Sequence, residues 1–237
     1  MPGTLQLVGF GPSGWGGLLP GAAGMTLLVS AGAFALGLAL GSLGAWGKLS
    51  GSRSGGAAAA AYTTVLRGVP DLLVIYLVYF GGSQALSAVG QWLGSGGFLG
   101  VNGFAAGVLA IGVVSGAYQT EVLRGAWLAV PRGQWEAARA LGLPRRVLLL
   151  RVAAPQVLRI ALPGLGNVWL VVVKGSALIS VTGLVELSRQ VGIAAGSTRR
   201  PFEFYLTGAV LYLVLTTLSG ALFHLAERRA GRWVIRA

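Results

Sequence analysis

Five polar side chains in otherwise apolar segments are the first candidates for chemistry: Arg67, Asp71, Glu121, Asn167 and Lys174. A charged side chain inside a membrane-spanning segment is costly in lipid, so it faces protein, water or a solute. Such residues commonly mark the path of an ion or a polar substrate. The chemistry that they predict is reversible binding of a charged solute, and we take all five as candidate residues of a substrate pathway.

Arg67 and Asp71 stand four residues apart and would share one face of a helix. Pro70 lies between them, so a helix here would be kinked or interrupted. Two interpretations follow from this spacing. Either the pair forms a salt bridge that fixes the kink, or Asp71 places negative charge on the pathway and favours a cationic substrate.

Glu121 and Arg124 are three residues apart, and we expect them to form a structural ion pair on one helix face. The charged neighbours of Lys174 in the sequence are Arg159 and Glu186, both far from it. Its counter-ion must therefore come from another helix, and Glu121 is one candidate.

Catalysis by side chains has little support in this sequence. The chain has no cysteine and a single histidine, His224. Without cysteine it has no thiolate nucleophile and no Cys-ligated zinc. A lone histidine without clustered carboxylates makes neither a catalytic triad nor a metal site. We therefore expect no enzymatic activity, no metal site and no cofactor in this chain.

The elements that must position these residues are membrane helices. Of the 237 residues, 54% are hydrophobic and 10% are charged, and the mean hydropathy is +0.75, which is too apolar for a soluble domain. A spanning helix needs about 20 apolar residues. The sequence predicts an all-α membrane protein with five spans, at about 25–46, 57–80, 103–130, 161–185 and 202–225.

Glycine-rich stretches divide the apolar segments. The charge-free run 72–120 is too long for one crossing, and the sequences GGSQ and GSGG within it predict a turn between two helices. Small residues spaced four apart, at 37–41, 103–107 and 112–116, let helix backbones approach closely. We interpret these glycines as packing residues.

The basic residues predict the orientation. One set of span ends carries Lys48, Arg53, six arginines between 132 and 159 and four more from Arg228 on, whereas the opposite side carries Arg189, Arg199 and Arg200. The positive-inside rule then places the N-terminus outside and the C-terminus in the cytoplasm. The net charge of +12 is spread over span ends and forms no single basic face, so we expect no nucleic-acid binding.

The external segment 186–203 is predicted to be an amphipathic surface loop. Alternatively, Arg199 and Arg200 meet acidic residues of another protein in a salt-sensitive contact.

The polar segment 131–160 interrupts the apolar pattern. A short helix is predicted over 135–141, with Glu136 in its first turn, ended by Gly142 and Pro144. The small side chains of Ala137 and Ala138 leave a surface that another protein can approach closely. From the residues alone, this segment is either a solvated connection between helices or a docking surface.

A resemblance bears on this choice. The residues Glu136, Ala137, Ala138, Gly142 and Pro155 reproduce the spacing of the EAA motif of ABC importer permeases, with Val152 and Ala154 in place of the usual Ile and Leu. The stretches 67–70, 117–125, 130–134 and 162–174 resemble those of the polar amino acid permeases of the histidine, arginine and glutamine type. The resemblance runs from Met25 to Arg229.

The resemblance implies the architecture of a type I ABC importer permease, with residues 1–237 as a single transmembrane domain and 131–160 as its cytoplasmic coupling loop. In this family Glu136 would contact the ATPase, Ala137 and Ala138 would form the packed surface, and Gly142 would form the turn. The implied partners are two ATP-binding subunits, which hold ATP and magnesium, a second homologous permease subunit, and an extracytoplasmic substrate-binding protein. A heterodimer of permeases is favoured over a homodimer because Asp71 is present.

The resemblance also implies a multi-pass protein of the bacterial inner membrane that carries polar, cationic amino acids of the histidine, arginine, lysine and ornithine class. The alternative is a permease for opines or for a non-cationic polar amino acid such as glutamine.

Overall fold

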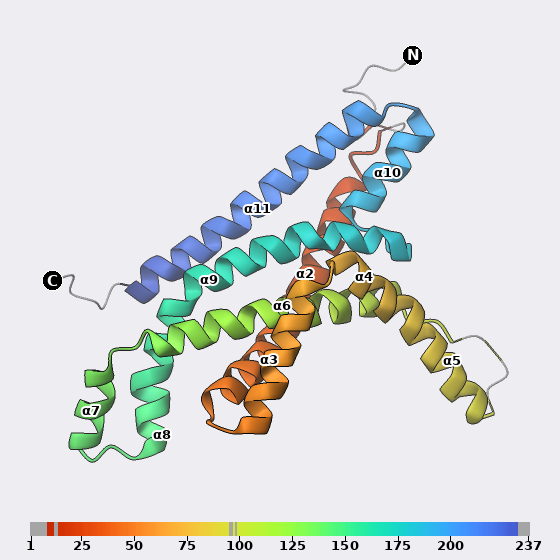
Figure 1. Ribbon diagram of the computed structural model, residues 1–237. Helices are drawn as coiled ribbons and strands as arrows, with labels where there is room; N and C mark the ends of the chain where they lie inside the picture. The colour runs from red at the N-terminus through yellow and green to blue at the C-terminus, as the bar shows by residue number, and fades with distance from the viewer. Residues whose placement is uncertain (1–8, 12–13, 95–96, 98, 232–237) are drawn as a thin grey trace.

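The computed structural model describes residues 9–11, 14–94, 97 and 99–231 (Figure 1). All regular secondary structure in these residues is helical. Five stretches are long and apolar enough to cross a membrane: Leu19–Leu49, Asp71–Trp92, Gly103–Leu128, Arg145–Thr182 and Pro201–Gly231. The predicted all-α architecture with five spans is confirmed in this part of the chain. Arg232 and Arg236, which contributed to the predicted orientation, lie outside the described residues.

Helices α2 (Leu19–Leu49) and α6 (Gly103–Leu128) form the most closely packed pair. A Cβ added to Gly41 of α2 would lie 2.7 Å from Cβ of Gln119 and 3.1 Å from the backbone nitrogen of Thr120. One added to Gly112 of α6 would lie 2.7 Å from the Leu36 side chain. These glycines therefore permit the close approach of two backbones, as their spacing predicts.

The second span begins later than predicted. Helix α3 (Arg53–Gly68) ends before Val69, whose φ of −94° and ψ of 134° are extended, because a residue that precedes proline disfavours the helical region. Helix α4 (Asp71–Tyr76) then starts a new run. The prediction of one span over 57–80 is wrong, and Pro70 is the reason.

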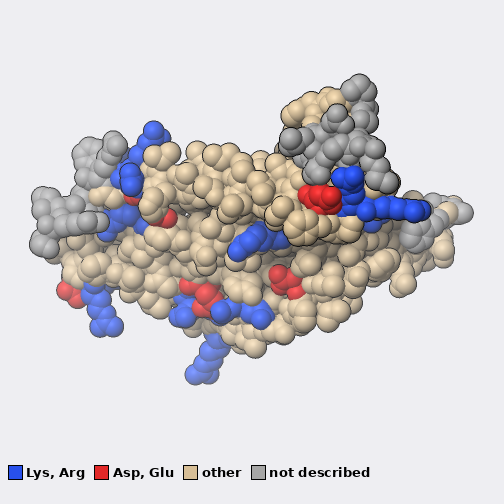
Figure 2. All heavy atoms as spheres, turned by 90° about the horizontal axis from the view of Figure 1, so that it is seen from above, with Lys and Arg blue, Asp and Glu red and all other residues tan. Residues whose placement is uncertain are grey.

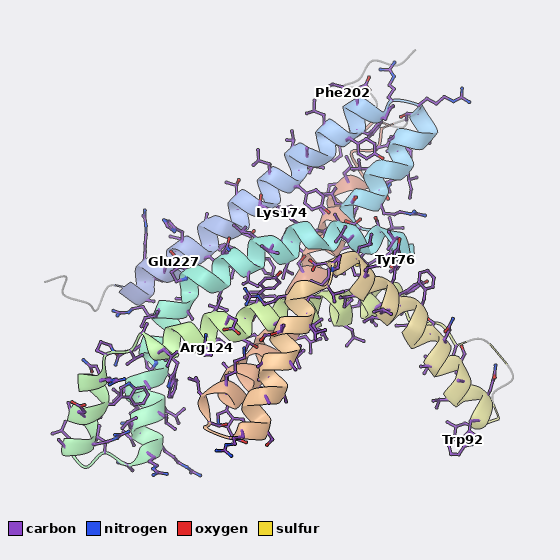
Figure 3. All side chains as sticks on the ribbon, viewed as in Figure 1. Tyr76, Trp92, Arg124, Lys174, Phe202 and Glu227 are labelled. Carbon is purple, nitrogen blue, oxygen red and sulfur yellow. The ribbon has the colours of Figure 1, made fainter. Side chains whose placement is uncertain are left out.

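This second run continues without a break through a π-helical turn, η1 (Leu77–Gly81), into α5 (Gly82–Trp92). Gly81 and Gly82 both adopt helical dihedral angles, so the GGSQ sequence does not form the predicted turn. Figure 1 shows that α5 extends away from the other helices, and Trp92 lies near its far end (Figure 3).

The fourth span is the last part of a longer helical run. Helix α7 (Arg132–Ala140) and the short α8 (Arg145–Val147) form a hairpin at one end of the molecule (Figure 1). A π-helical segment η2 (Leu148–Ala153), helix α9 (Ala154–Gly175) and the 3-10 helix η3 (Ser176–Thr182) continue from α8. The 38 residues from Arg145 to Thr182 exceed the roughly 20 that a bilayer requires, so the run extends beyond the hydrocarbon.

Segment 186–203 is a packed helix, and the prediction of a surface loop is wrong. Helix α10 (Leu187–Thr198) buries Leu187, Val191 and Ala194, which form a core cluster with Phe204 of α11 (Pro201–Gly231). Arg199 ends α10 in the left-handed conformation, with a φ of 55°.

Glu186 anchors the start of α10. Its side chain is fully buried and accepts hydrogen bonds from the backbone nitrogens of Ser188 (2.9 Å) and Arg189 (2.8 Å). The hydroxyls of Tyr212 (3.0 Å) and Thr26 (3.3 Å) also donate to it. Burial raises the pKa of Glu186 despite these four donors. One carboxyl group thus joins α2, α10 and α11.

The surface of the molecule is largely apolar. On α11, Leu213, Leu218 and Leu222 are each more than half exposed, and Figure 2 shows that uncharged side chains make up most of the visible face. Such a surface is suited to lipid and not to water.

Candidate functional site

A cavity of about 200 Å³ lies among α4, α6 and α9. Asp71, Tyr118 and Asn167 line it together with apolar side chains such as Ile75 and Val172. Two of the five predicted pathway residues, Asp71 and Asn167, therefore meet in one place. Asn167 is exposed, so the cavity opens to the outside of the subunit.

The interruption of the helix at Pro70 positions Asp71. Because the chain is extended at Val69, Asp71 becomes the first residue of α4. A carboxylate at a helix N-terminus is favoured by the helix dipole. No described residue forms an ion pair with Asp71, so its charge is available to a cationic group in the cavity.

Arg67 does not pair with Asp71, which excludes the predicted mutual salt bridge. Its guanidinium carbon instead lies 5.4 Å from the centroid of the Tyr118 ring, within the range of a cation–π contact. Since Tyr118 also lines the cavity, Arg67 contacts a residue of the cavity wall.

Lys174 is exposed and lies near the end of α9. One face of α9 carries Asn167, Val171 and Lys174, which are spaced four and three residues apart. Two of them, Asn167 and Val171, line the cavity. Among the described residues, none forms an ion pair with Lys174. The same face of α9 thus presents an amide and, about two turns further on, an ammonium group.

Glu121 is not the counter-ion of Lys174. It forms ion pairs with Lys48 of α2 and with Arg124, whose Nε lies 3.0 Å from Glu121 Oε2. Figure 3 shows Arg124 and Lys174 well apart on different helices. The predicted Glu121–Arg124 pair is confirmed, and Glu121 lies away from the cavity lining.

The α7–α8 hairpin carries the residues of the EAA motif. Glu136 and Ala137 are exposed on α7, and Gly142 ends the helix with a φ of 68°, which favours glycine. Ala138, however, is only 4% exposed within the subunit, in which α7 packs against η2. The prediction that its side chain forms part of an outer docking surface is corrected. Pro155 occupies the first turn of α9.

The sequence analysis used Lys48 only to predict the orientation and assigned no role to Tyr118. Lys48 is the first charged residue of the chain, yet its pairing with Glu121 joins positions 73 residues apart, which no local spacing reveals. Tyr118 stands among the residues that carried the resemblance, but its place between Arg67 and the cavity depends on the packing of α3 against α6.

The fold and the EAA hairpin define a binding-protein-dependent permease. Residues 33–232 match the family described as "Binding-protein-dependent transport system inner membrane component". The chain belongs to this family, and it is a multi-pass inner-membrane permease subunit of an ABC importer of the polar amino acid type.

Individual proteins agree with this assignment. The chain is 56% identical to the octopine transport system permease protein OccQ of Rhizobium meliloti over 99% of both chains. It is 39% identical to the histidine/lysine/arginine/ornithine permease protein HisQ of Escherichia coli, over 94% of this chain and 98% of that one. A crystal structure of an amino acid ABC transporter with histidines superposes with a TM-score of 0.76 at 34% identity, covering 91% of this chain and 95% of that one.

Proposed function

We propose that this chain forms half of the translocation pathway of an ATP-driven importer of opines. The 56% identity to an octopine permease, against 39% to a permease for histidine, lysine, arginine and ornithine, favours the opine alternative over free cationic amino acids. Octopine and arginine share a guanidinium group, and octopine carries a second carboxylate. Glutamine has no cationic side chain.

The observation that carries the proposal is that Asp71 lines the cavity and, among the described residues, has no ion-pair partner. Lys174 also has none among them, and it lies on the α9 face that carries Asn167 and Val171. Asp71 lines the cavity and would receive the guanidinium group in a charge-assisted hydrogen bond. Asn167 would donate to or accept from the substrate's polar atoms. Lys174, further along the same face of α9, would attract a carboxylate. Arg67 acts through Tyr118 and holds the wall, and Glu121 stabilises the helix bundle.

The chain, residues 1–237, acts in this proposal as a single permease domain with 131–160 as its coupling loop. Basic residues gather at the ends of α2, α7 and α8, so the positive-inside rule favours a cytoplasmic hairpin, an external N-terminus and a cytoplasmic C-terminus. The exposed Glu136 and Ala137 would contact an ATP-binding subunit, while Ala138 fixes α7 to its own subunit.

The remaining partners follow from the family. Two ATP-binding subunits would supply ATP hydrolysis with magnesium, an extracytoplasmic binding protein would deliver the substrate, and a second permease would complete the pathway. A heterodimer is favoured, since one opine then meets a single Asp71. The transport cycle requires a two-state membrane element whose equilibrium the docked ATPases shift.

Competitive uptake into vesicles that hold the assembled importer tests the substrate. Octopine should inhibit uptake of labelled octopine at lower concentrations than arginine does, and glutamine should not inhibit it. Asp71→Asn should reduce octopine and arginine uptake about tenfold, the effect of losing one charged hydrogen bond, whereas Glu227→Gln, which alters a carboxylate remote from the cavity, should leave both unchanged. Equal inhibition by glutamine would contradict the proposal.

A further inference from the structure

Two adjoining grooves at the α7 end of the molecule lie outside the proposed substrate site. The first has a volume of about 520 Å³ and lies between the last turns of α2 and α6 and the start of α9. Its lining is almost wholly apolar and includes Ala45, Leu123, Leu150 and Val157. A groove of this kind on a membrane protein accommodates hydrocarbon.

The second groove, of about 480 Å³, differs in character because two guanidinium groups line it. Arg139 comes from α7 and Arg145 from α8, so the two arginines face the space between the arms of the hairpin. No acidic residue lines either groove, and no described carboxylate forms an ion pair with either arginine. The groove therefore carries uncompensated positive charge.

The two grooves are continuous, since Trp127 and Leu149 line both. The ring of Trp127 packs on that of Trp135, with centroids 4.9 Å apart and the planes tilted by 46°. Tryptophan rings concentrate at the depth of the lipid headgroups. Helix α2 ends at Leu49 and α6 at Leu128, beside these rings, so the junction lies where a membrane helix meets the headgroup layer.

We propose that the joined grooves bind an anionic phospholipid from the leaflet on the α7 side. An acyl chain would fill the apolar groove, and the phosphate would accept hydrogen bonds from Arg139 and Arg145. Guanidinium groups bind phosphate through paired donors, and basic pockets between membrane helices are suited to anionic headgroups. The absence of any acidic lining residue makes a net negative lipid the complementary occupant.

This lipid would connect α7 to the helix bundle. Arg139 lies on α7, three residues after Glu136, while the apolar groove belongs to α2, α6 and α9. A bound lipid would therefore hold α7 against the bundle, in addition to the packing of Ala138, and would make the position of α7 depend on membrane composition.

Retention of lipid by the purified, assembled importer tests the proposal. Native mass spectrometry with added phosphatidylglycerol or phosphatidylcholine should show preferential retention of phosphatidylglycerol. Arg139→Gln and Arg145→Gln should each weaken this retention about fivefold, the contribution of one basic residue near an anionic headgroup. Arg229→Gln, which removes one positive charge from the end of α11, is the matched control and should change it little.

A second variant separates a lipid from a free phosphate. Ala154→Phe adds volume to the apolar groove without changing its charge and should weaken phosphatidylglycerol retention while leaving any binding of inorganic phosphate unchanged. Equal retention of the two lipids would overturn the proposal. It would also be overturned if the arginine variants kept their lipid but lost the ATP-binding subunits, because the arginines would then be a protein contact.

Discussion

Lys48 of α2 forms an ion pair with Glu121 of α6, and Thr63 of α3 accepts a hydrogen bond of 2.7 Å from the same ammonium group. Arg124 adds a second cation to Glu121. The side chains of Lys48 and Glu121 are 16% and 24% exposed, so this network joins three helices in a partly buried position. It accounts for the charge of Glu121, which from the sequence suggests a substrate pathway.

Removal of Glu121 should destabilise the bundle because it leaves Lys48 partly buried without a counter-ion. We expect Glu121→Gln to cost about 2 kcal/mol of stability, measured by thermal unfolding in detergent. Arg124→Ala should cost less than about 1 kcal/mol, since that side chain is 39% exposed. The double variant Lys48→Met, Glu121→Leu should recover most of the loss. A role for Glu121 in the pathway would instead appear as lost uptake at unchanged stability.

Lys174 should discriminate between substrates. Lys174→Met should raise the KM for octopine about tenfold, the effect of losing one charged hydrogen bond, and should affect arginine less because arginine has one carboxylate fewer. Initial uptake rates measured over a range of concentrations give the KM for octopine and the KM for arginine. Equal changes for the two substrates would indicate that Lys174 meets a protein group of a neighbouring subunit.

The close contact of α2 and α6 should tolerate no added side chain at Gly41. A Cβ there would lie 3.1 Å from the backbone of Thr120, which cannot move without shifting α6, so Gly41→Ala should cost about 1–3 kcal/mol. Gly24→Ala, in the same helix with no atom within 4 Å of the added Cβ, should be neutral or stabilise by up to about 1 kcal/mol. Thermal unfolding compares the two variants, and equal effects would refute the packing role.

The pH dependence of stability should reveal the titration of the Glu186 carboxyl group. Burial raises the pKa of this carboxyl group in the folded protein, so the folded state favours the protonated form. Its contribution to stability is therefore complete below the pKa of an unfolded glutamate and is lost as the pH rises through the folded pKa. Wild-type stability should fall over this window, and Glu186→Gln should flatten the profile. A wild type that gains stability there would show that its four donors outweigh burial.

The sequence predicted the number of spans well because hydropathy alone determines it, but it located the second span poorly. Pro70 ends one helix, while Gly81 and Gly82 do not end the next, since a long apolar helix accommodates both. Tertiary packing decides which way a side chain points, and for this reason Ala138 turned out to face inward.

The sequence predicted the residue types of the candidate site, but it predicted less well which residues contact one another. Asp71 and Asn167 meet in a cavity although 96 positions separate them in the sequence, and only the packing of α4, α6 and α9 brings them together. The suggested pairing of Lys174 with Glu121 was wrong for the same reason, because Lys48 reaches Glu121 from a different helix.

In the proposed function, α7 transmits the action of an ATP-binding subunit to the membrane helices. A photo-crosslinking amino acid placed at Ala137, which is exposed on α7, tests it in the purified, assembled importer, with the same group at Phe202, which is 75% exposed at the start of α11, as the control. We expect crosslinking to the ATP-binding subunit from position 137, altered in yield by ATP, and none from position 202. Crosslinking from position 137 to lipid alone, with or without ATP, would contradict it.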